Sequence, residues 1–439
     1  MKRTVRLLRK AVFVCLLISI VFVPWMAGSA KSNEAVMKQI VGYFIEWGIY
    51  GRNYLVKDIV TTGSADKLTV INYAFGNVAP DANGQVVCKL GDDWADYQKP
   101  WTADQSVTGQ EVTWPNPILG NFQQLKQLKS LYPNIRVVIS LGGWTWSKYF
   151  SDAALTPDSR RAFVQSCVDL FIKGNLPDPG WGGMGGPGSG TGVFDGIDID
   201  WEYPAAPGNA GNIYRPEDTQ NFTALLAEFR SQLDAVKPGL LLTIAAPAGQ
   251  NQYSKIELDK IHSSLDWINI MAYDFHGTWE TTTNFQANLY PSPQDPSAPG
   301  MSVAGVAQAY LAAGVPAQKI VIGAPFYGRG WTGVANTSFG LYQAASGPAP
   351  ATWEAGNEDY KVLKTLIGAN GYVRHWDGKA QDAWLFNGST FWTFDDEVTL
   401  LRKAEFIRSL HLGGMMFWEL SGDDGTLVKA MANGINAGH

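Results

Sequence analysis

Short apolar runs rich in β-branched residues recur along the chain, and amphipathic segments with helical periodicity separate them. The apolar runs predict eight β-strands, at residues 39–45, 68–75, 136–141, 193–201, 240–246, 267–273, 320–325 and 413–418. The amphipathic segments predict helices, at residues 121–131, 157–173, 216–236, 302–313 and 397–410. Eight strands that alternate with helices predict an α/β fold, the (β/α)8 TIM barrel. A doubly wound open sheet is the alternative, but no GxGxxG turn follows an early strand.

Two segments are longer than the loops that a barrel requires. Residues 76–121 follow the second strand and contain Trp94, Trp101 and Trp114 among polar residues, so we expect this loop at the mouth of the barrel. Residues 328–393 follow the seventh strand and contain aromatic β-like runs and a short helical segment. They predict a small α+β subdomain inserted in a barrel domain that spans residues 31–439.

The first 30 residues have the pattern of a secretory signal peptide. Five basic residues lie within positions 1–10, residues 11–25 are apolar, and Gly28-Ser29-Ala30 offers small side chains at a cleavage position. We therefore expect a cleaved signal peptide at residues 1–30 and a secreted protein that has no contact with a membrane after cleavage. An uncleaved anchor is the alternative, but an apolar run of about 15 residues is short for a bilayer.

Charge and histidine spacing exclude several function classes. The formal charge is −6, and loss of the five basic residues in the signal peptide changes it to −11, which disfavours a nucleic-acid partner. The five histidines form no HExxH or clustered pattern, so we predict no metal and no cofactor. We expect a monomer.

Two cysteines remain once Cys15 has left with the signal peptide. Cys88 and Cys167 are 79 residues apart, and this spacing does not show whether they pair. We favour two isolated thiols. The chain also has 17 Trp, 17 Tyr and 20 Phe, more rings than an aliphatic core needs, so either the core is unusual or a surface is lined with rings.

The predicted fourth strand carries the candidate chemistry. Because side chains alternate along a strand, Asp198, Asp200 and Glu202 share one face, and apolar side chains share the other. Three carboxyl groups that point into a barrel cannot all ionise freely, so at least one pKa should be raised, as a general acid requires. Glu202 is nearest the C-terminal mouth and is the candidate acid. Purely structural carboxylates are one alternative, and an oxygen-ligated Ca²⁺ or Mg²⁺ site is another, although one strand offers only one line of ligands.

Residues 195–204, DGIDIDWEYP, match the DxxDxDxE signature of the family 18 glycoside hydrolases, the chitinases. Further segments resemble the family's motifs in the expected order, namely SLGG at 140–143, MAYD at 271–274, YGR at 327–329 and FWE at 417–419. Residues 43–53, YFIEWGIYGRN, are most similar to the bacterial chitinase A type, and residues 328–393 resemble that type's insertion domain.

The resemblance implies a retaining, substrate-assisted hydrolysis of chitin and chito-oligosaccharides. Glu202 would protonate the glycosidic oxygen, while the substrate's own N-acetyl group attacks the anomeric carbon to give an oxazolinium ion. Asp200 would orient the acetamide and Asp198 would share a proton with it. The resemblance implies further roles for Tyr273 at the acetamide oxygen, for Asp274 at the distorted sugar, and for Ser140 and Asp195 as support behind the carboxyl groups. Asp195 could equally be structural.

The resemblance also gives the aromatic residues a role, because the apolar faces of sugar rings stack on aromatic planes. It implies a substrate-binding set made up of Tyr43, Trp47, Phe75, Trp144, Met271, Trp279, Tyr327, Arg329, Trp353, Glu354 and Trp418. Ordinary core packing is the alternative for each ring, and we favour it for Trp146, Trp181, Trp376 and Trp384. Two other functions stay open: an enzyme acting on N-glycan cores or peptidoglycan, and a chitin-binding lectin, which usually lacks the acid.

Overall fold

The computed structural model describes residues 38–297 and 300–437. The signal peptide predicted at residues 1–30 lies outside these described residues. Within them, no helix combines the length and the apolar character that a membrane crossing demands.

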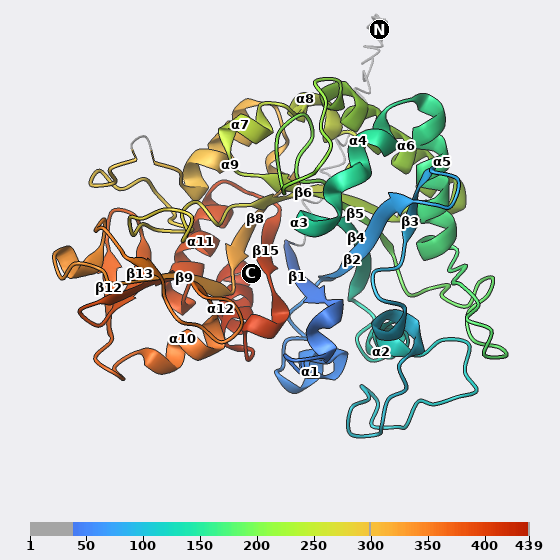
Figure 1. Cartoon of the computed structure of the whole chain (residues 1–439), viewed down its shortest axis with the longest axis horizontal. Helices are drawn as coiled ribbons and strands as arrows, with labels where there is room; N and C mark the ends of the chain where they lie inside the picture. Colours follow the sequence, from blue (N-terminus) through green and yellow to red (C-terminus); the bar gives the residue numbers. More distant parts are fainter. Residues whose placement is uncertain (1–37, 298–299, 438–439) are drawn as a thin grey trace, which may run out of the picture. The chain divides into compact units, whose positions relative to one another are not determined.

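Eight parallel strands form a closed barrel (Figure 1). Around the barrel they are β1 (Gln39–Ile45), β2 (Val70–Pro80), β4 (Arg136–Gly142), β5 (Gly196–Asp200), β6 (Leu241–Pro247), β7 (Trp267–Met271), β8 (Ile320–Pro325) and β15 (Gly414–Trp418). β1 pairs with both β2 and β15, which closes the barrel. The predicted (β/α)8 TIM barrel is confirmed. Because all strands are parallel, their C-terminal ends meet at one mouth.

Helices pack on the outside of this barrel. Five match predicted segments: α2 (Gly120–Leu131), α5 (Pro157–Cys167), α6 (Asp218–Val236), α9 (Val303–Ala312) and α11 (Glu397–Ser409). Further helices are α1 (Val56–Thr61), α3 (Gly143–Trp146), α4 (Phe150–Ala154), α7 (Gln250–Tyr253), α8 (Leu258–Ile261) and α12 (Thr426–Asn436). Side-chain oxygens cap several of them: at α5, Thr156 accepts from the N–H of Ser159, and at α11, Asp396 accepts from the N–H of Val398.

The alternation predicted for the fourth strand is present in β5. Ile197 and Ile199 are fully buried in the core between barrel and helices, where Trp201 stacks on Phe150 with ring centroids 5.4 Å apart. Asp198 and Asp200 have the opposite parity and point into the barrel. β5 is shorter than predicted, and Glu202 lies just past its C-terminal end.

The long segment after the second strand begins as a hairpin. β2 continues to Pro80 because its last residues pair antiparallel with β3 (Val86–Lys89). The hairpin carries Cys88 to α5, where it forms a disulfide with Cys167, with the two Cα atoms 4.9 Å apart. Our preference for two isolated thiols was therefore wrong, because the extension of β2 brings together residues whose spacing gave no signal.

Removal of this disulfide should destabilise the protein without changing the site. We expect the double variant Cys88→Ser/Cys167→Ser to lose about 4 kcal/mol of unfolding free energy, because a cross-link between residues 79 apart restricts the unfolded chain. Urea denaturation followed by circular dichroism would measure the loss, with wild type in reducing buffer as a parallel sample. A loss below about 1 kcal/mol would contradict the expectation.

A second, antiparallel sheet lies between β8 and α11 (Figure 1). Its strands are β9 (Tyr327–Thr332), β10 (Gly347–Pro348), β11 (Asn357–Asp359), β12 (Val373–Asp377), β13 (Asp382–Phe386) and β14 (Thr390–Phe394), with α10 (Tyr360–Leu366) after β11. The predicted small α+β insertion after the seventh barrel strand is confirmed. Its apolar core contains Trp331, Trp384 and Phe391, and also Phe285 from the segment after β7, a contribution that the sequence did not predict.

The four tryptophans for which we favoured core packing differ in how far they are buried. Trp384 is buried as predicted, and Trp146 and Trp376 are half-buried. Trp181 is 50% exposed, so that prediction was wrong. It lies between Gly180 and Gly182, both at positive φ, in a segment without helix or strand.

Candidate active site

Asp198 lies inside the barrel and is fully buried. Its Oδ1 accepts from the hydroxyl of Thr243 (2.5 Å) and the amide of Asn269 (3.3 Å), and its Oδ2 accepts from the hydroxyls of Tyr43 (2.9 Å) and Ser140 (2.8 Å). A carboxylate accepts about four hydrogen bonds, so these donors from β6, β7, β1 and β4 saturate it. Burial raises the pKa of Asp198, and the four hydrogen bonds oppose that rise.

Asp200 and Glu202 follow Asp198 toward the mouth of the barrel, and both are buried. Burial, with the charges of Glu202 and Asp198, raises the pKa of Asp200 well above its usual range. Burial also raises the pKa of Glu202, from 4.5 to about 7; the Tyr203 side chain opposes the rise and the charge of Asp274 adds to it. Oδ1 of Asp200 has no hydrogen-bond partner among the described residues. The arrangement therefore offers a buried proton donor beside an unpaired acceptor.

The backbone at Glu202 is held from both sides. The hydroxyl of Ser147, which follows α3, accepts from the N–H of Glu202 (2.9 Å) and lies 3.0 Å from the carbonyl oxygen of Asp200. The side-chain amide of Asn212 donates to the carbonyl oxygen of Glu202 (3.0 Å). These two contacts fix the peptide groups that orient the acid.

A second anchored group lies beyond β7. Asp274 forms a two-point ion pair with Arg329, at 2.8 and 2.9 Å, which ties the loop after β7 to β9 of the insertion. The guanidinium group of Arg329 also lies over the rings of Trp279 and Tyr327, with its carbon 5.3 and 5.2 Å from the two ring centres. Tyr273 lies edge-on to Tyr327, with ring centroids 6.4 Å apart. Burial and the carboxylates Asp200, Asp274, Glu202 and Asp198 raise the pKa of Tyr273 well above its usual range, so its hydroxyl keeps its proton, which it donates to Sδ of Met416 at 3.8 Å.

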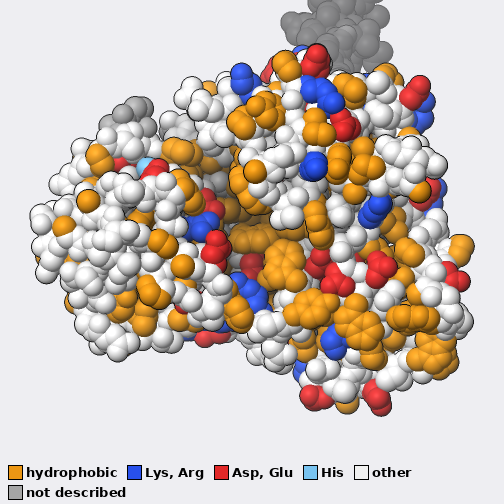
Figure 2. Space-filling model, viewed as in Figure 1, with side chains coloured by type: hydrophobic (Ala, Val, Ile, Leu, Met, Phe, Trp, Pro, Cys, Tyr) orange, Lys and Arg blue, Asp and Glu red, His pale blue; other side chains and the backbone are white. Residues whose placement is uncertain are grey.

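Aromatic rings from three barrel strands form a floor at the mouth. Trp418, at the end of β15, stacks on Phe75, with ring centroids 5.6 Å apart. Its ring centroid also lies 5.4 Å from that of Tyr43 and 6.4 Å from that of Trp47. Figure 2 shows a hollow on this face with apolar side chains at its base and charged side chains along its walls. A floor of this kind fits the apolar face of a sugar ring.

Four tryptophans of the expected substrate-binding set are exposed to solvent. Trp47, Trp144, Trp279 and Trp353 are all exposed, from 40% for Trp47 to 60% for Trp279, so core packing does not explain them. Met271 is half-buried and packs with the residues that line the barrel interior. Glu354 is exposed beside Trp353 and accepts from the amide of Asn357 at 3.4 Å.

Of the two residues expected to support the carboxyl groups, Ser140 contacts one of them and Asp195 does not. Ser140 contacts Asp198, as its place on β4 predicts. Asp195 lies before β5, at the opposite end of the strand from Glu202, where it accepts from the N–H of Val137 and pairs with Lys129 (2.8 Å). This placement favours the structural role that stayed open for Asp195, because seven residues of extended chain separate it from Glu202.

Four residues of the site were not predicted from the sequence. Thr243 and Asn269 are polar residues at inward positions of otherwise apolar strands, and that pattern could have identified them. Ser147 and Asn212 lie outside the barrel strands and gave no such signal. In the described part of the chain, no group of three or more His, Cys, Asp or Glu side chains is arranged to hold a metal ion.

The chain is similar to known proteins over most of its length. Residues 39–423 match the family model described as Glycosyl hydrolases family 18. Chitinase A1 of Niallia circulans is 40% identical, over 93% of this chain and 60% of its own length, and chitinase C of Streptomyces lividans is 42% identical, over 87% and 57%. The chain thus spans about three fifths of these curated relatives.

A solved structure agrees with the fold. The catalytic domain of a psychrophilic chitinase B from Arthrobacter TAD20 superposes with a TM-score of 0.86 at 43% sequence identity. The match covers 91% of this chain and 95% of that domain, so it includes both the barrel and the inserted sheet.

Proposed function

The chain belongs to glycosyl hydrolase family 18, and from this membership we propose that it is a chitinase that hydrolyses β-1,4 linkages between N-acetylglucosamine units of chitin and chito-oligosaccharides. The names of its relatives support this substrate. The observation that carries the proposal is the buried line Asp198, Asp200 and Glu202, which ends in an acid with a pKa of about 7 near a floor of aromatic rings.

The proposed mechanism is substrate-assisted and retains the anomeric configuration. Glu202 donates its proton to the glycosidic oxygen, and the acetamide oxygen of the substrate forms the new bond to the anomeric carbon. The unpaired Oδ1 of Asp200 accepts the acetamide N–H and stabilises the positive charge of the oxazolinium ion. Tyr273 donates to the acetamide oxygen. Water then opens the ring of the ion, with Glu202 acting as the base.

The remaining proposed roles concern the walls of the site and the destination of the protein. Asp274, held by Arg329, binds the distorted sugar, and the exposed tryptophans bind neighbouring sugars of the chain. The basic, apolar and small-residue pattern of residues 1–30 supports secretion.

Product analysis on chitohexaose tests this function. We expect shorter oligomers whose newly formed reducing ends are β anomers, because the mechanism retains configuration. Chromatography that separates anomers, run within minutes of mixing, would measure both products and stereochemistry. Cellohexaose has the same linkage without the acetamido group and should remain uncut. New α anomers would contradict the mechanism, and intact chitohexaose would contradict the proposed activity.

A further inference from the structure

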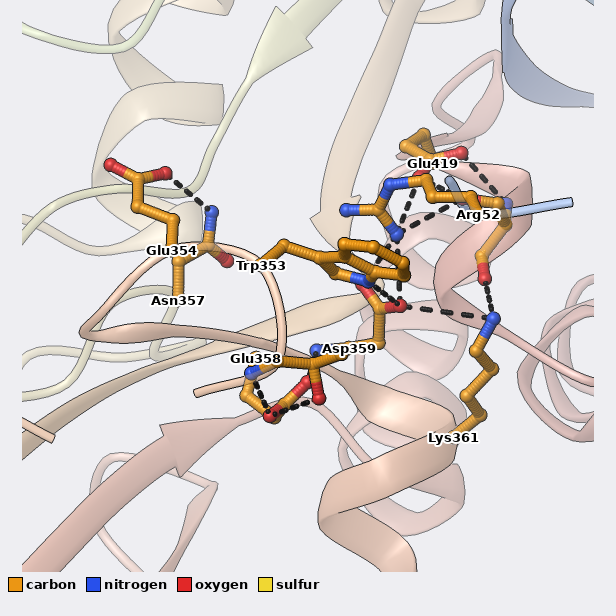
Figure 3. Close-up of polar contacts among 10 residues, drawn as sticks. Arg52, Trp353, Glu354, Asn357, Glu358, Asp359, Lys361 and Glu419 are labelled. Atoms are coloured by element: carbon orange, nitrogen blue, oxygen red, sulfur yellow. Dashed lines mark hydrogen bonds and ion pairs between the residues drawn. The ribbon is translucent and has the colours of Figure 1, made fainter. Parts of the chain in front are cut away.

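A cluster of charged side chains joins three segments that are distant in the sequence (Figure 3). Arg52 comes from the loop after β1, Asp359 ends β11 of the insertion, and Glu419 follows β15. One guanidinium nitrogen of Arg52 lies 2.9 and 2.8 Å from the two carboxylate oxygens of Asp359, and 3.7 Å from Oε1 of Glu419. Both partners of the first ion pair are largely buried, with side chains 20% and 6% exposed. Arg52 therefore ties the insertion to the barrel.

The exposed ring of Trp353 rests on this ion pair. Its indole N–H donates to Oδ2 of Asp359 at 3.2 Å, and the guanidinium carbon of Arg52 lies 5.1 Å from the centre of the ring. Figure 3 shows the indole beside the guanidinium group. The ring also lies close to Gly51, where an added Cβ would come within 3.4 Å of it. Trp353 nevertheless stays 47% exposed, so one part of the ring is held and another is presented to solvent.

The segment that carries Trp353 is fixed on its other side as well. Glu358 accepts from both the N–H (2.8 Å) and the hydroxyl (2.9 Å) of Thr352, which closes the turn around Trp353. The ammonium group of Lys361 lies 3.7 Å from Oδ2 of Asp359 and balances its charge. The orientation of the indole thus depends on Asp359, and the position of Asp359 relative to the barrel depends on Arg52.

We propose that Arg52 and Asp359 are positioning residues that hold Trp353 in the orientation in which it binds a sugar of the substrate chain. This inference rests on the proposed function. An exposed side chain on a turn loses conformational freedom when it binds a ligand, and a ring that is ordered beforehand avoids that loss. The contacts of Arg52 and Asp359 do not include Asp198, Asp200 or Glu202. Their effect therefore falls on binding and leaves the chemical step unchanged.

A double-mutant cycle tests whether Arg52 acts through Trp353. We expect Arg52→Ala to raise the KM for chitohexaose about tenfold and to change kcat less than about twofold. In the Trp353→Ala background the same substitution should change KM less than about twofold, since the ring that it positions is gone. Arg52→Lys should recover part of the affinity, because the charge opposite Asp359 is kept while the planar group over the ring is lost.

A matched control exists in the same insertion. Arg374 pairs with Asp396 (2.6 Å) and lies over the ring of Trp376 (5.4 Å), but on β12, at the edge of the sheet away from β9. Arg374→Ala breaks an equivalent arrangement and should leave the KM for chitohexaose unchanged. Equal KM effects of Arg52→Ala with and without Trp353, or a loss confined to kcat, would overturn the proposal.

Hydrogen exchange separates this proposal from the proposed activity. We expect amides of residues 350–360 to exchange faster in Arg52→Ala than in wild type, and in Arg374→Ala as slowly as in wild type. This measurement needs no turnover, so it stands even if chitohexaose is not a substrate. Unchanged exchange in Arg52→Ala would show that the ion pair does not order the turn and would overturn the proposal.

Discussion

Replacing Glu202 with Gln should lower the turnover number on chito-oligosaccharides by at least about 10²-fold, within the range that general acids contribute. The amide keeps the size of the carboxyl group but has no acidic proton to transfer to the glycosidic oxygen. The contacts of Ser147 and Asn212 hold the backbone of residue 202, so they are available to the variant as well. The expected loss is therefore chemical, and KM should change little.

The pH profile of wild type should report the same proton. Burial raises the pKa of Glu202 to about 7, so the acid is protonated below that pH and ionised above it. We expect kcat/KM to fall on the alkaline side with an apparent pKa near 7, because only the protonated form can act as the acid. The free energy of unfolding changes in the same direction. The folded state holds this proton up to about pH 7, and the unfolded state releases it near 4.5, so Glu202 destabilises the fold as pH rises through that window.

These two effects give the Glu202→Gln variant an unusual signature. At pH 8 it should be nearly inactive and yet melt at a higher temperature than wild type, because it buries no ionisable group at this position. Steady-state kinetics and thermal melts from pH 5 to 9 would measure both. Glu228→Gln, a change of the same size on the outer helix α6, should leave both unchanged. Activity of Glu202→Gln within tenfold of wild type would contradict the assignment of the acid.

The parts of the fold and site that the sequence predicted correctly depend on local periodicity. The alternation in β5 places Ile197 and Ile199 in the outer core and Asp198 inside the barrel, because a strand has only two faces. Eight strand and helix patterns in order left few topologies to choose from, so the barrel followed. The resemblance then identified Asp274 and Arg329, which the structure joins in one ion pair.

The contacts that could not be predicted join residues that are distant in the sequence, so they depend on the paths of the loops in the folded chain. The pairing of Cys88 with Cys167 required the extension of β2 beyond the barrel, and the choice between the two roles of Asp195 required its ion pair with Lys129. The contacts between Arg52 and Asp359 join residues 307 positions apart through an insertion whose orientation no pattern in the sequence sets. Such contacts are products of tertiary packing and have no periodic signature.

The second large effect that we expect concerns the substrate's acetamido group, for which Oδ1 of Asp200 is the proposed acceptor. A two-carboxylate retaining enzyme needs a nucleophile opposite the acid, across the sugar ring. Here the buried carboxyl groups of Asp198 and Asp200 come from β5 and that of Glu202 lies just past its end, and Asp198 already accepts four hydrogen bonds. Oδ1 of Asp200 is buried and has no hydrogen-bond partner in the described part of the chain, which is costly unless the substrate supplies one. The N–H of an acetamide is such a donor, and its carbonyl oxygen is then directed at the anomeric carbon.

A substrate that has a free amine at the cleavage-site sugar should therefore be cut at least about 10³-fold more slowly, since it loses an intramolecular nucleophile. The experiment compares chitohexaose with hexamers that are deacetylated at a single known position, with products sequenced by mass spectrometry. Cleavage should stop only at the linkage whose non-reducing-side sugar carries the amine, and should continue at linkages where that sugar is acetylated. Binding of the same hexamers, measured by calorimetry with Glu202→Gln, separates a lost nucleophile from lost affinity. If the deacetylated linkage is cut as fast as the acetylated one, a protein group and not the substrate attacks the anomeric carbon.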